Sequence, residues 1–324
     1  MTIRSAFLAA ALLSIALAPG GVRAQTYPAK AVTLIVPASP GGVIDTMARM
    51  LAQNLSAAWK SQVIVENKPG ATNQIAAEYV ARSAPDGHTL FLSPEATFVV
   101  NPFLFSKLPY DAQKDFTPIT GLISIRQALV AHPSVQAGNV KELIALAKGK
   151  PGELNYGTFG VGSSGHLNME MFGKLTGAKL TAVHYKGAAP AFNDVLAGHI
   201  QLLFVATGSA MQQAAAGKVK FLGIGSPKRL AKLPNVEAIA ETVPGFEAVS
   251  WFALFGPAGM PRPVVDKIRN EVVRILNDPK IRETFLEKRF FEPTPSTPEE
   301  LAALVKSESA KWGQLVRDTG IKIK

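Results

Sequence analysis

The sequence predicts an α/β fold divided into two lobes, and three observations support this prediction. Short apolar runs of strand length alternate along the chain with segments whose apolar residues recur at helical spacing. Three of the predicted strands lead through glycine-containing loops into helices. The chain has 324 residues, which is more than one hydrophobic core usually organises, so two domains or lobes are expected.

Residues 1–24 have the features of a secretory signal peptide. Arg4 precedes an apolar run over residues 6–18, and a Pro-Gly-Gly break leads to small residues before a cleavage site after Ala24. The apolar run is too short to span a bilayer comfortably, and the remaining chain has no uninterrupted apolar stretch of about 18 residues. We therefore expect an exported chain of residues 25–324 that does not span a membrane.

The charge and the absence of cysteine narrow the functional classes. The net charge is +10, and it falls to +8 when Arg4 and Arg23 are removed with the signal peptide. The lysines and arginines form no run and do not alternate with aromatic residues, so we expect no nucleic-acid partner. An exported protein without cysteine depends on core burial rather than on disulfides for its stability.

The first strand-loop-helix unit begins with a strand over residues 34–36. The strand ends at Pro37, a loop with Gly41 and Gly42 follows, and apolar residues then recur at helical spacing. Such a turn leaves unpaired N–H groups at the start of the helix, which can bind an anion. The alternative is an ordinary turn whose glycines only supply positive φ. If the loop binds a ligand, a β-branched residue at Gly42 should abolish binding by restricting φ and blocking approach to the backbone.

Polar side chains follow the third predicted strand, which covers residues 88–92. Ser93, Glu95 and Thr97 lie where that strand ends, and open α/β sheets bind ligands at the carboxyl ends of their strands. A plain connecting loop is the alternative. The next segment, residues 101–115, is rich in turn formers and aromatics, and we expect irregular surface structure there.

A second strand-loop-helix unit contains the glycine-rich segment Gly157–Leu167. Three glycines of this segment match G-x-G-x-x-G, the pattern of dinucleotide-binding loops. That fold needs an acid at the end of the next strand, but the next strand ends at Lys186, so we expect no nicotinamide cofactor. The N–H groups near Ser163 and Ser164 can instead bind a carboxylate or a phosphate, while one of the two serines caps the helix.

The remaining elements continue the alternation. A third loop, residues 186–191, leads into a helix that ends at Gly198, and Pro190 suits the first turn of that helix. The other expected elements are strands over 62–66, 181–185, 200–205, 220–224 and 251–255, helices over 73–83, 140–148 and 263–276, an apolar segment over 116–130, a turn at 207–209, a short alanine helix before Gly217, and a final helix that a capping box at 297–300 opens and that runs to about Arg317.

Six blocks of sequence together resemble the Bug family, the extracytoplasmic solute receptors of tripartite tricarboxylate transporters. The blocks occur in the order found in the family and cover essentially the whole mature chain. They are LIVPASPGGVIDTMARMLA, VIVENKPGATNQIAAEYVARSAPDGHTLFL, NPFLFSKLPYDAQKDFTPIT, YGTFGVGSSGHL, VHYKGAAPAFNDVLAGHI and LPNVEAIAETVPGFEAVSWFALFGPAGMP.

The resemblance implies a periplasmic receptor with a two-lobed, type II-like periplasmic-binding-protein fold and a ligand cleft between the lobes. It assigns residues 25–121 and 251–324 to lobe 1 and residues 122–250 to lobe 2. It implies a receptor rather than an enzyme, without a cofactor or a metal, that captures a small organic carboxylate and delivers it to membrane transporter subunits. We expect the receptor to be a monomer.

The resemblance also implies how the ligand is held. Main-chain N–H groups and ordered waters hold the carboxylate in such receptors, and this arrangement avoids a buried lysine that would itself need desolvating. We expect Asp45 to order its loop or a bridging water rather than to contact the carboxylate directly. With the polar residues after the third strand added, the predicted ligand-binding residues are Pro40, Gly41, Gly42, Asp45, Ser93, Glu95, Thr97, Phe159, Gly162, Ser163, Ser164, Gly187, Ala188 and Ala189.

Three positions bear on the nature of the ligand. Val205 stands where many family members have aspartate, Phe159 is bulkier than the usual residue, and Glu95 adds an acid near the expected cleft. These residues favour a ligand with an apolar or aromatic body and with a donor group for Glu95.

Two other functions compete with transport. A receptor for a membrane sensor would share the cleft and differ only on the outer faces of the lobes. An exported serine hydrolase would use Ser163 or Ser164, but neither has the G-x-S-x-G pattern, and His166 is adjacent in sequence rather than on a separate loop. The five histidines have no zinc-site spacing.

Overall fold

The computed structural model describes residues 27–322, and the predicted signal peptide lies outside the described residues. Ten strands of this part of the chain form one mixed sheet in the order β2-β1-β3-β9-β4-β7-β5-β6, with β8 and β10 also paired to β4. The strands are β1 (Val32–Val36), β2 (Val63–Asn67), β3 (Thr89–Pro94), β4 (Phe116–Ala131), β5 (Asn155–Thr158), β6 (Thr181–His184), β7 (Leu202–Ala206), β8 (Lys220–Ile224), β9 (Val249–Pro257) and β10 (Phe291–Pro293).

The helices connect these strands and cover the sheet. Short 3-10 segments lie at Ala71–Asn73 and Glu287–Arg289, and one π-helical turn lies at Arg282–Leu286. The α-helices are α2 (Val43–Trp59), α3 (Gln74–Ala81), α4 (Ala96–Val99), α5 (Asn101–Leu104), α6 (Val140–Gly149), α7 (Ser164–Thr176), α8 (Ala188–Leu196), α9 (Thr207–Ala215), α10 (Ile239–Thr242), α11 (Arg262–Asn277), α12 (Pro279–Ile281) and α13 (Pro298–Thr319).

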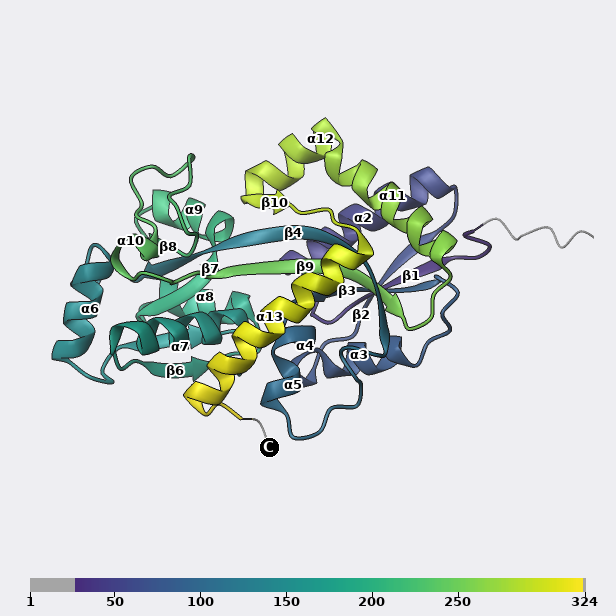
Figure 1. Cartoon of the computed structure of the whole chain (residues 1–324). Coiled ribbons are helices and arrows are strands. Elements are labelled where there is room, and N and C mark those ends of the chain that lie inside the picture. Colours follow the sequence, from purple (N-terminus) through teal and green to yellow (C-terminus); the bar gives the residue numbers. More distant parts are fainter. Residues whose placement is uncertain (1–26, 323–324) are drawn as a thin grey trace, which may run out of the picture.

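The molecule has two lobes, and the long strands β4 and β9 run between them (Figure 1). Residues 116–126 of β4 pair with β9, whereas residues 127–131 pair with β7 and β8. β4 therefore changes partners between Arg126 and Gln127, later along the strand than the predicted lobe limit at Gly121. One strand thus belongs to both lobes, and its pairing with β9 shifts register between Pro118 and Thr120 and again between Gly121 and Ile123.

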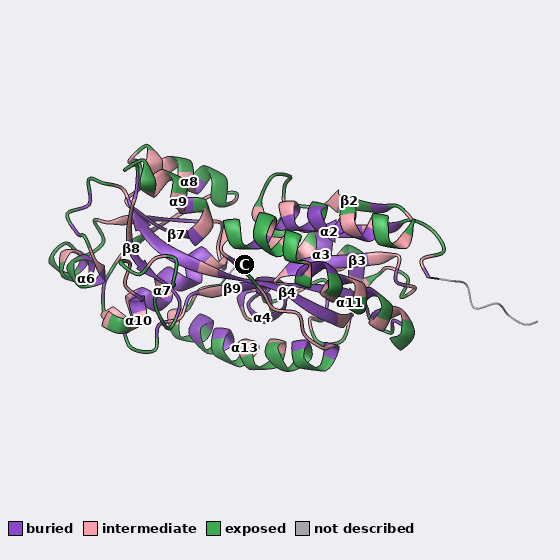
Figure 2. Ribbon diagram, turned by 90° about the horizontal axis from the view of Figure 1, so that it is seen from above, coloured by how far each residue is buried: buried purple, intermediate pink, exposed green. Residues whose placement is uncertain are grey.

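Helix α13 lies across both lobes on one side of the sheet. It packs against α4, α5, β4 and α7, and Figure 1 shows it crossing in front of β4 and β9. In Figure 2 it lies on the side opposite α2, α8 and α9. Its start is the predicted capping box, in which Thr297 accepts the N–H of Glu300 and the Glu300 side chain accepts the N–H of Thr297.

Three hydrophobic clusters hold these elements together. One lies between α2, α11 and the strands β1 and β3, and it buries Met47 and Leu51 completely. A second lies in the other lobe under α8 and includes Val195 and Leu203. The largest extends through both lobes, where Phe98 stacks on Phe255 with ring centroids 3.9 Å apart. Burial of this apolar surface, at about 25 cal/mol per Å², is the main favourable term for folding.

Most predicted elements are confirmed to within a few residues, and two segments differ. Residues 101–115 are not simply irregular surface, because α5 forms there and Asn101, Leu104 and Tyr110 are buried. Asn101 donates to the Tyr110 hydroxyl, which in turn donates to the carbonyl of Thr97. These hydrogen bonds let the turn-forming residues pack inward.

The predicted turn at 207–209 is wrong, since α9 begins at Thr207. The Thr207 hydroxyl donates to the Arg126 carbonyl on β4, and Gly208 packs closely on the carbonyl of Arg289. These contacts start the helix without a preceding loop, which the sequence alone did not indicate.

Candidate functional site

The strand register directs the predicted loops of the two lobes toward each other. Pro94 at the end of β3 lies opposite Phe252 of β9, which lies opposite Ile123 of β4. Ala206 at the end of β7 lies opposite Gln127 of β4. Because β3 runs in the same direction as β4 while β7 runs against it, the carboxyl ends of these strands approach from opposite sides. The parallel partners of β3 and β7 extend the same arrangement, so loops from both lobes converge there.

The loop after β1 is organised by Asp45. Its carboxylate accepts the N–H of Gly41 at 2.9 Å, two hydrogen bonds from Arg49 at 2.9 and 3.0 Å, and one from Asn67 at 2.9 Å. Asn67 also donates to the carbonyl of Ala38. Burial acts to raise the pKa of Asp45, but the hydrogen bonds from Arg49, Gly41 and Asn67 outweigh it and lower the pKa. Asp45 is thus a charged residue that shapes the loop, in the role expected from the sequence.

The start of α2 has no side-chain cap. Its first N–H groups therefore remain available at an exposed loop that includes Pro40, Gly41 and Gly42. The N–H of Gly41 is not among them, because Asp45 accepts it. The expectation that Gly42 needs a special φ is also wrong: Gly42 has φ −76°, whereas Gly41 has φ 89°.

The polar residues after β3 lie in the protein interior. The Ser93 hydroxyl donates to the Thr97 hydroxyl at 2.9 Å, and both residues are fully buried. Glu95 is 5% exposed, its carboxyl group accepts the N–H of Trp251 at 3.3 Å, and the Ser250 hydroxyl lies beside it. Burial raises the pKa of Glu95 to about 7. Ser93 and Thr97 satisfy each other, and Glu95 faces the strands that join the lobes.

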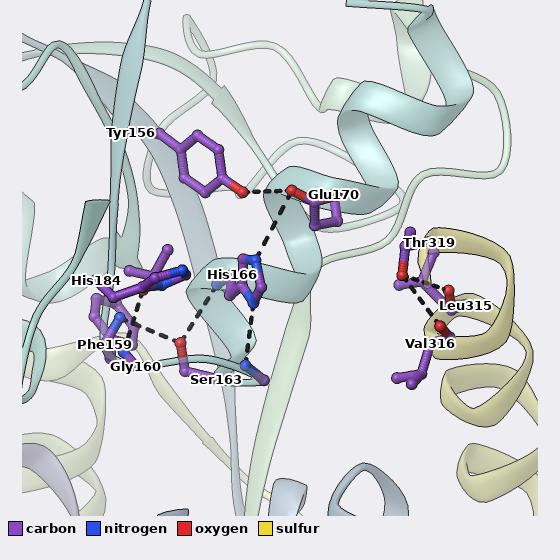
Figure 3. A network of polar contacts seen from close by, with 12 residues as sticks. Tyr156, Phe159, Gly160, Ser163, His166, Glu170, His184, Leu315, Val316 and Thr319 are labelled. Carbon is purple, nitrogen blue, oxygen red and sulfur yellow. Dashed lines mark hydrogen bonds and ion pairs between the residues drawn. The ribbon is translucent and has the colours of Figure 1, made fainter. Parts of the chain in front are cut away.

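The loop before α7 is held by two of its own side chains (Figure 3). Ser163 is the helix cap, and its hydroxyl accepts the N–H groups of His166 and Phe159. The His166 ring accepts the N–H of Gly162 at its Nδ1 atom, at 3.1 Å. The predicted donor at Gly162 is therefore already paired within the loop.

His166 can accept this hydrogen bond because it is neutral. Burial, and secondarily the neighbouring His184, lower the pKa of His166 to about 4. Its Nε2 atom lies 3.8 Å from the carboxylate of Glu170, which accepts the hydroxyl of Tyr156 at 2.5 Å. Figure 3 shows this chain of contacts from Tyr156 to the Gly162 loop. The histidine thus fixes the loop rather than acting as a base.

Gln127 connects the start of α7 to the strands between the lobes. Its Nε2 atom donates to the hydroxyl of Ser164 at 2.8 Å and to the hydroxyl of Ser250 at 2.7 Å. Its Oε1 atom accepts the side-chain amide of Asn168 at 2.9 Å. Since Ser250 also contacts Glu95, polar contacts run from the end of β3 to the first residue of α7.

The start of α8, like the loop before α2, is open. Gly187 has φ 125°, no atom lies within 4 Å of the position that a Cβ would take, and no side chain caps the helix. Ala188 and Ala189 are exposed, and Pro190 lies in the first turn as expected. The N–H groups of Ala188 and Ala189 can therefore reach a ligand without side-chain obstruction.

The structure brings together the loops that carry most predicted residues, and it adds residues that the sequence reading missed. Gln127 and Ser250 lie on the joining strands, while Asn67, Arg49 and His166 orient the loops. A lone amide within the apolar segment 116–130 was the only sequence signal for Gln127. Two surface hollows, of about 390 and 350 Å³, lie elsewhere, beside Arg229 and beside His88, and are lined by none of the predicted residues.

Within the described part of the chain, no catalytic base is hydrogen-bonded to the hydroxyl of Ser163 or Ser164. The Ser163 hydroxyl accepts main-chain N–H groups, the Ser164 hydroxyl accepts from Gln127, and the Nδ1 atom of His166 faces Gly162. A nucleophilic serine needs a base within hydrogen-bond reach of its hydroxyl, so this geometry does not support a hydrolase. Across residues 27–322, no three His, Asp or Glu side chains are grouped to hold a metal ion. No helix among the described residues is long and apolar enough to cross a membrane.

Comparison with known proteins identifies relatives of the whole chain. Residues 47–321 match the sequence model of a family described as "Tripartite tricarboxylate transporter family receptor". Protein BugT of Bordetella pertussis is 32% identical over 320 residues, which cover 97% of this chain and 98% of BugT. Two solved structures are also similar. Rpa4515 of R. palustris with adipate has a TM-score of 0.86 and 32% identity, covering 91% of this chain and 99% of its own. MatC from Rhodopseudomonas palustris with bound malate has a TM-score of 0.82 and 30% identity, and the match covers 90% of this chain and 100% of MatC.

Proposed function

Because this chain belongs to the tripartite tricarboxylate transporter receptor family, we propose that it captures a small organic carboxylate in the periplasm and delivers it to membrane transporter subunits. Its family and structural neighbours are solute-binding receptors rather than enzymes. Two of those neighbours carry adipate and malate, which are both dicarboxylates. We extend the carboxylate class, but neither particular compound, to this chain.

The observation that carries the proposal is the convergence of helix starts from both lobes. α2 and α8 begin without side-chain caps, and the loop at Ser163 and Ser164 lies at the start of α7. The unpaired N–H groups and the helix dipoles favour a negative charge at these positions. A carboxylate has two oxygens that can accept several such donors, so it suits this site better than a neutral group does.

We propose that the ligand lies between lobe 1, residues 25–121 and 251–324, and lobe 2, residues 122–250. The change of partners along β4 supports a joint of this kind, although it lies nearer Gln127 than Gly121. A ligand that contacts both lobes favours closure only as far as it binds the closed form more tightly. The proposed contacts are the available N–H groups at the starts of α2, α7 and α8, with Asp45, His166 and Asn67 orienting the loops.

We further propose that the ligand has an apolar or aromatic body with a donor group. Val205 is buried among apolar residues where an aspartate would add charge, and Phe159 packs beside Gly165 at the start of α7. Tight binding of citrate, with no binding of aromatic or nicotinate-like acids, would contradict this part of the proposal.

Isothermal titration calorimetry of the mature chain tests the function. The ligands are adipate, malate, citrate and a panel of aromatic monocarboxylates, each paired with its amide. We expect at least one acid to bind and its amide to bind at least about tenfold more weakly, a difference of about 1.4 kcal/mol. Equal affinity for acids and amides, or no binding to any acid, would contradict a carboxylate receptor.

The membrane partner is a separate part of the proposal. Pull-down of membrane proteins by the ligand-loaded chain should recover transporter subunits. Recovery of a sensor instead would leave the ligand site unchanged but replace the transport function. Sedimentation of the ligand-free chain, which we expect to be a monomer, provides the reference state for that experiment.

A further inference from the structure

Both N–H groups and the carbonyl oxygen of the Gln127 side-chain amide make hydrogen bonds. These hydrogen bonds fix the direction in which the amide points. Gln127 is 4% exposed, and it lies at the position where β4 changes partners from β9 to β7. Its oxygen accepts the amide of Asn168, which is 1% exposed, and this contact orients the group so that the nitrogen faces the two serines. The nitrogen carries two hydrogens and donates to two acceptors.

This arrangement determines the direction of both serine hydroxyl groups. A hydroxyl that accepts a hydrogen bond from Gln127 must direct its own proton elsewhere. For Ser250, which is 4% exposed, the carboxyl group of Glu95 is the neighbouring acceptor. For Ser164 no protein acceptor takes the proton within residues 27–322, and Ser164 is only half-buried at the start of α7. One of the two lone pairs of the Ser164 oxygen is thus taken by Gln127, while the Ser164 proton remains available outside the network.

We propose that Gln127 is a positioning residue that makes the Ser164 hydroxyl a hydrogen-bond donor to the ligand carboxylate. This inference rests on the proposed function and adds a reason for selectivity. A site lined only with donors favours a carboxylate, whose oxygens only accept, over an amide, whose nitrogen would face another donor. In this proposal Gln127 acts without contacting the ligand, because its donation to the Ser164 oxygen keeps the Ser164 proton from pointing into the network.

The variant Q127E reverses the polarity of the network. A carboxylate at this position only accepts, so both serine hydroxyls and Asn168 can donate to it, and every partner keeps a hydrogen bond. The Ser164 proton then points toward Glu at position 127 and away from the ligand. We expect Q127E to weaken carboxylate binding by at least about tenfold and to reduce the ratio of acid to amide affinity. A role confined to stability would not change this ratio.

Three further variants separate this effect from misfolding and from the added charge. Q127M is neutral and similar in length, so it frees the Ser164 hydroxyl to rotate without introducing a carboxylate. S164A removes the donor itself, and S56A, the matched control, removes a serine hydroxyl of α2 that lies outside the network and accepts the N–H of Val63. We expect Q127M and S164A to weaken binding by several-fold, S56A to leave the affinity within about threefold of wild type, and Q127M to have no further effect in the S164A background.

Calorimetry with the tightest wild-type acid and its amide, alongside thermal unfolding of the ligand-free variants, gives the required measurements. The inference is overturned if S164A and Q127M bind the acid as wild type does, or if S56A weakens binding as much as S164A. It is also overturned if Q127E and Q127M lower the unfolding temperature without changing the affinity ratio. A wild-type chain that binds no acid at all refutes the proposed function itself, and this inference with it.

Discussion

The carboxyl groups of Asp45 and Glu95 are both buried, yet their surroundings shift their pKa values in opposite directions. Asp45 accepts hydrogen bonds from a guanidinium group, a main-chain N–H and a side-chain amide, which favour its charged form. Glu95 has one serine hydroxyl and one main-chain N–H, and burial dominates. The first residue can therefore hold a loop at any physiological pH, whereas the second titrates near neutrality.

Glu95 should make the stability of the protein depend on pH. Burial, with a further contribution from the charge of Glu308 on α13, raises its pKa from 4.5 to about 7. The folded state then binds more protons than the unfolded state between these values, so the contribution of Glu95 to stability is most favourable below pH 4.5 and is lost as the pH rises to 7. The expected loss approaches about 1.4 kcal/mol per unit of pKa shift.

Urea unfolding of wild type and E95Q at pH 5 and pH 8 measures this effect, because the glutamine side chain has nearly the same shape as that of glutamate and cannot titrate. We expect wild type to lose stability relative to E95Q between the two values. His166, whose pKa is lowered to about 4, contributes in the opposite direction in both proteins and cancels in the comparison. Parallel pH profiles would show that Glu95 is ionised throughout.

At the scale of the elements, the helices differ in whether a side chain caps their first turn. α7 and α13 begin with side-chain caps, Ser163 and Thr297, whereas α2 and α8 begin without them. An uncapped start that is not buried against another group leaves several N–H donors for solvent or for a ligand. Two of the three helices whose first turns lie in the predicted ligand loops are thus uncapped, and α3, α9 and α11 also begin without side-chain caps.

The two caps provide a matched pair of variants. S163A and T297A each remove one cap, and each should lower the free energy of unfolding by about 1 kcal/mol. Because Ser163 also accepts the N–H of Phe159, S163A should loosen the ligand loop and weaken carboxylate binding, while T297A should not. Denaturant unfolding and calorimetry on both variants measure the two effects. Equal affinities would place the Ser163 loop outside the ligand site.

Two glycines of the ligand loops should respond differently to alanine. Gly187 has φ 125°, a conformation that alanine rarely adopts, and the space around it is open. Gly42 has φ −76°, and its nearest neighbour is the Ser39 carbonyl at 4.0 Å. We therefore expect G187A to lower the melting temperature and weaken ligand binding, and G42A to fold as stably as wild type. Equal melting temperatures for the two variants would contradict the difference in backbone conformation.

At the scale of the whole molecule, the two lobes contact each other through loops as well as through the joining strands β4 and β9. The loop at Gly162 packs against Leu104 of α5, and the start of α9 packs at Gly208 against the carbonyl of Arg289. Both contacts need a residue without a side chain, because a Cβ would lie 2.0 Å from Leu104 or 2.3 Å from that carbonyl. These two close contacts, together with the packing of α13 against both lobes, determine how closely the lobes pack.

The variant G162A tests the contact between the lobes. It should destabilise the protein, by about 1–3 kcal/mol, since the added methyl group meets Leu104 and the residue has φ 75°. In an L104A background the steric part disappears, so the same substitution should cost less. Denaturant unfolding of the four proteins in this cycle measures the difference. Additive losses would mean that Gly162 is required only for its backbone conformation.

The sequence alone determined the alternation of strands and helices, the glycine loops and the family, because these depend on local spacing and on order along the chain. It located the cap of α7 at one of Ser163 and Ser164, the Thr297 capping box and the loop-ordering role of Asp45, which involve residues only a few positions apart. It did not reveal α9 at Thr207, or the pairing of the Gly41 and Gly162 N–H groups with Asp45 and His166.

Only the tertiary structure decided what links the two lobes. Gln127 and Ser250 are separated by more than a hundred residues, and their meeting with Ser164 depends on the register of β4 with β9 and β7. The pKa of Glu95 likewise depends on how deeply its surroundings bury it. Sequence spacing carries no information about such distant contacts, because they arise from how the strands pair after the chain has folded.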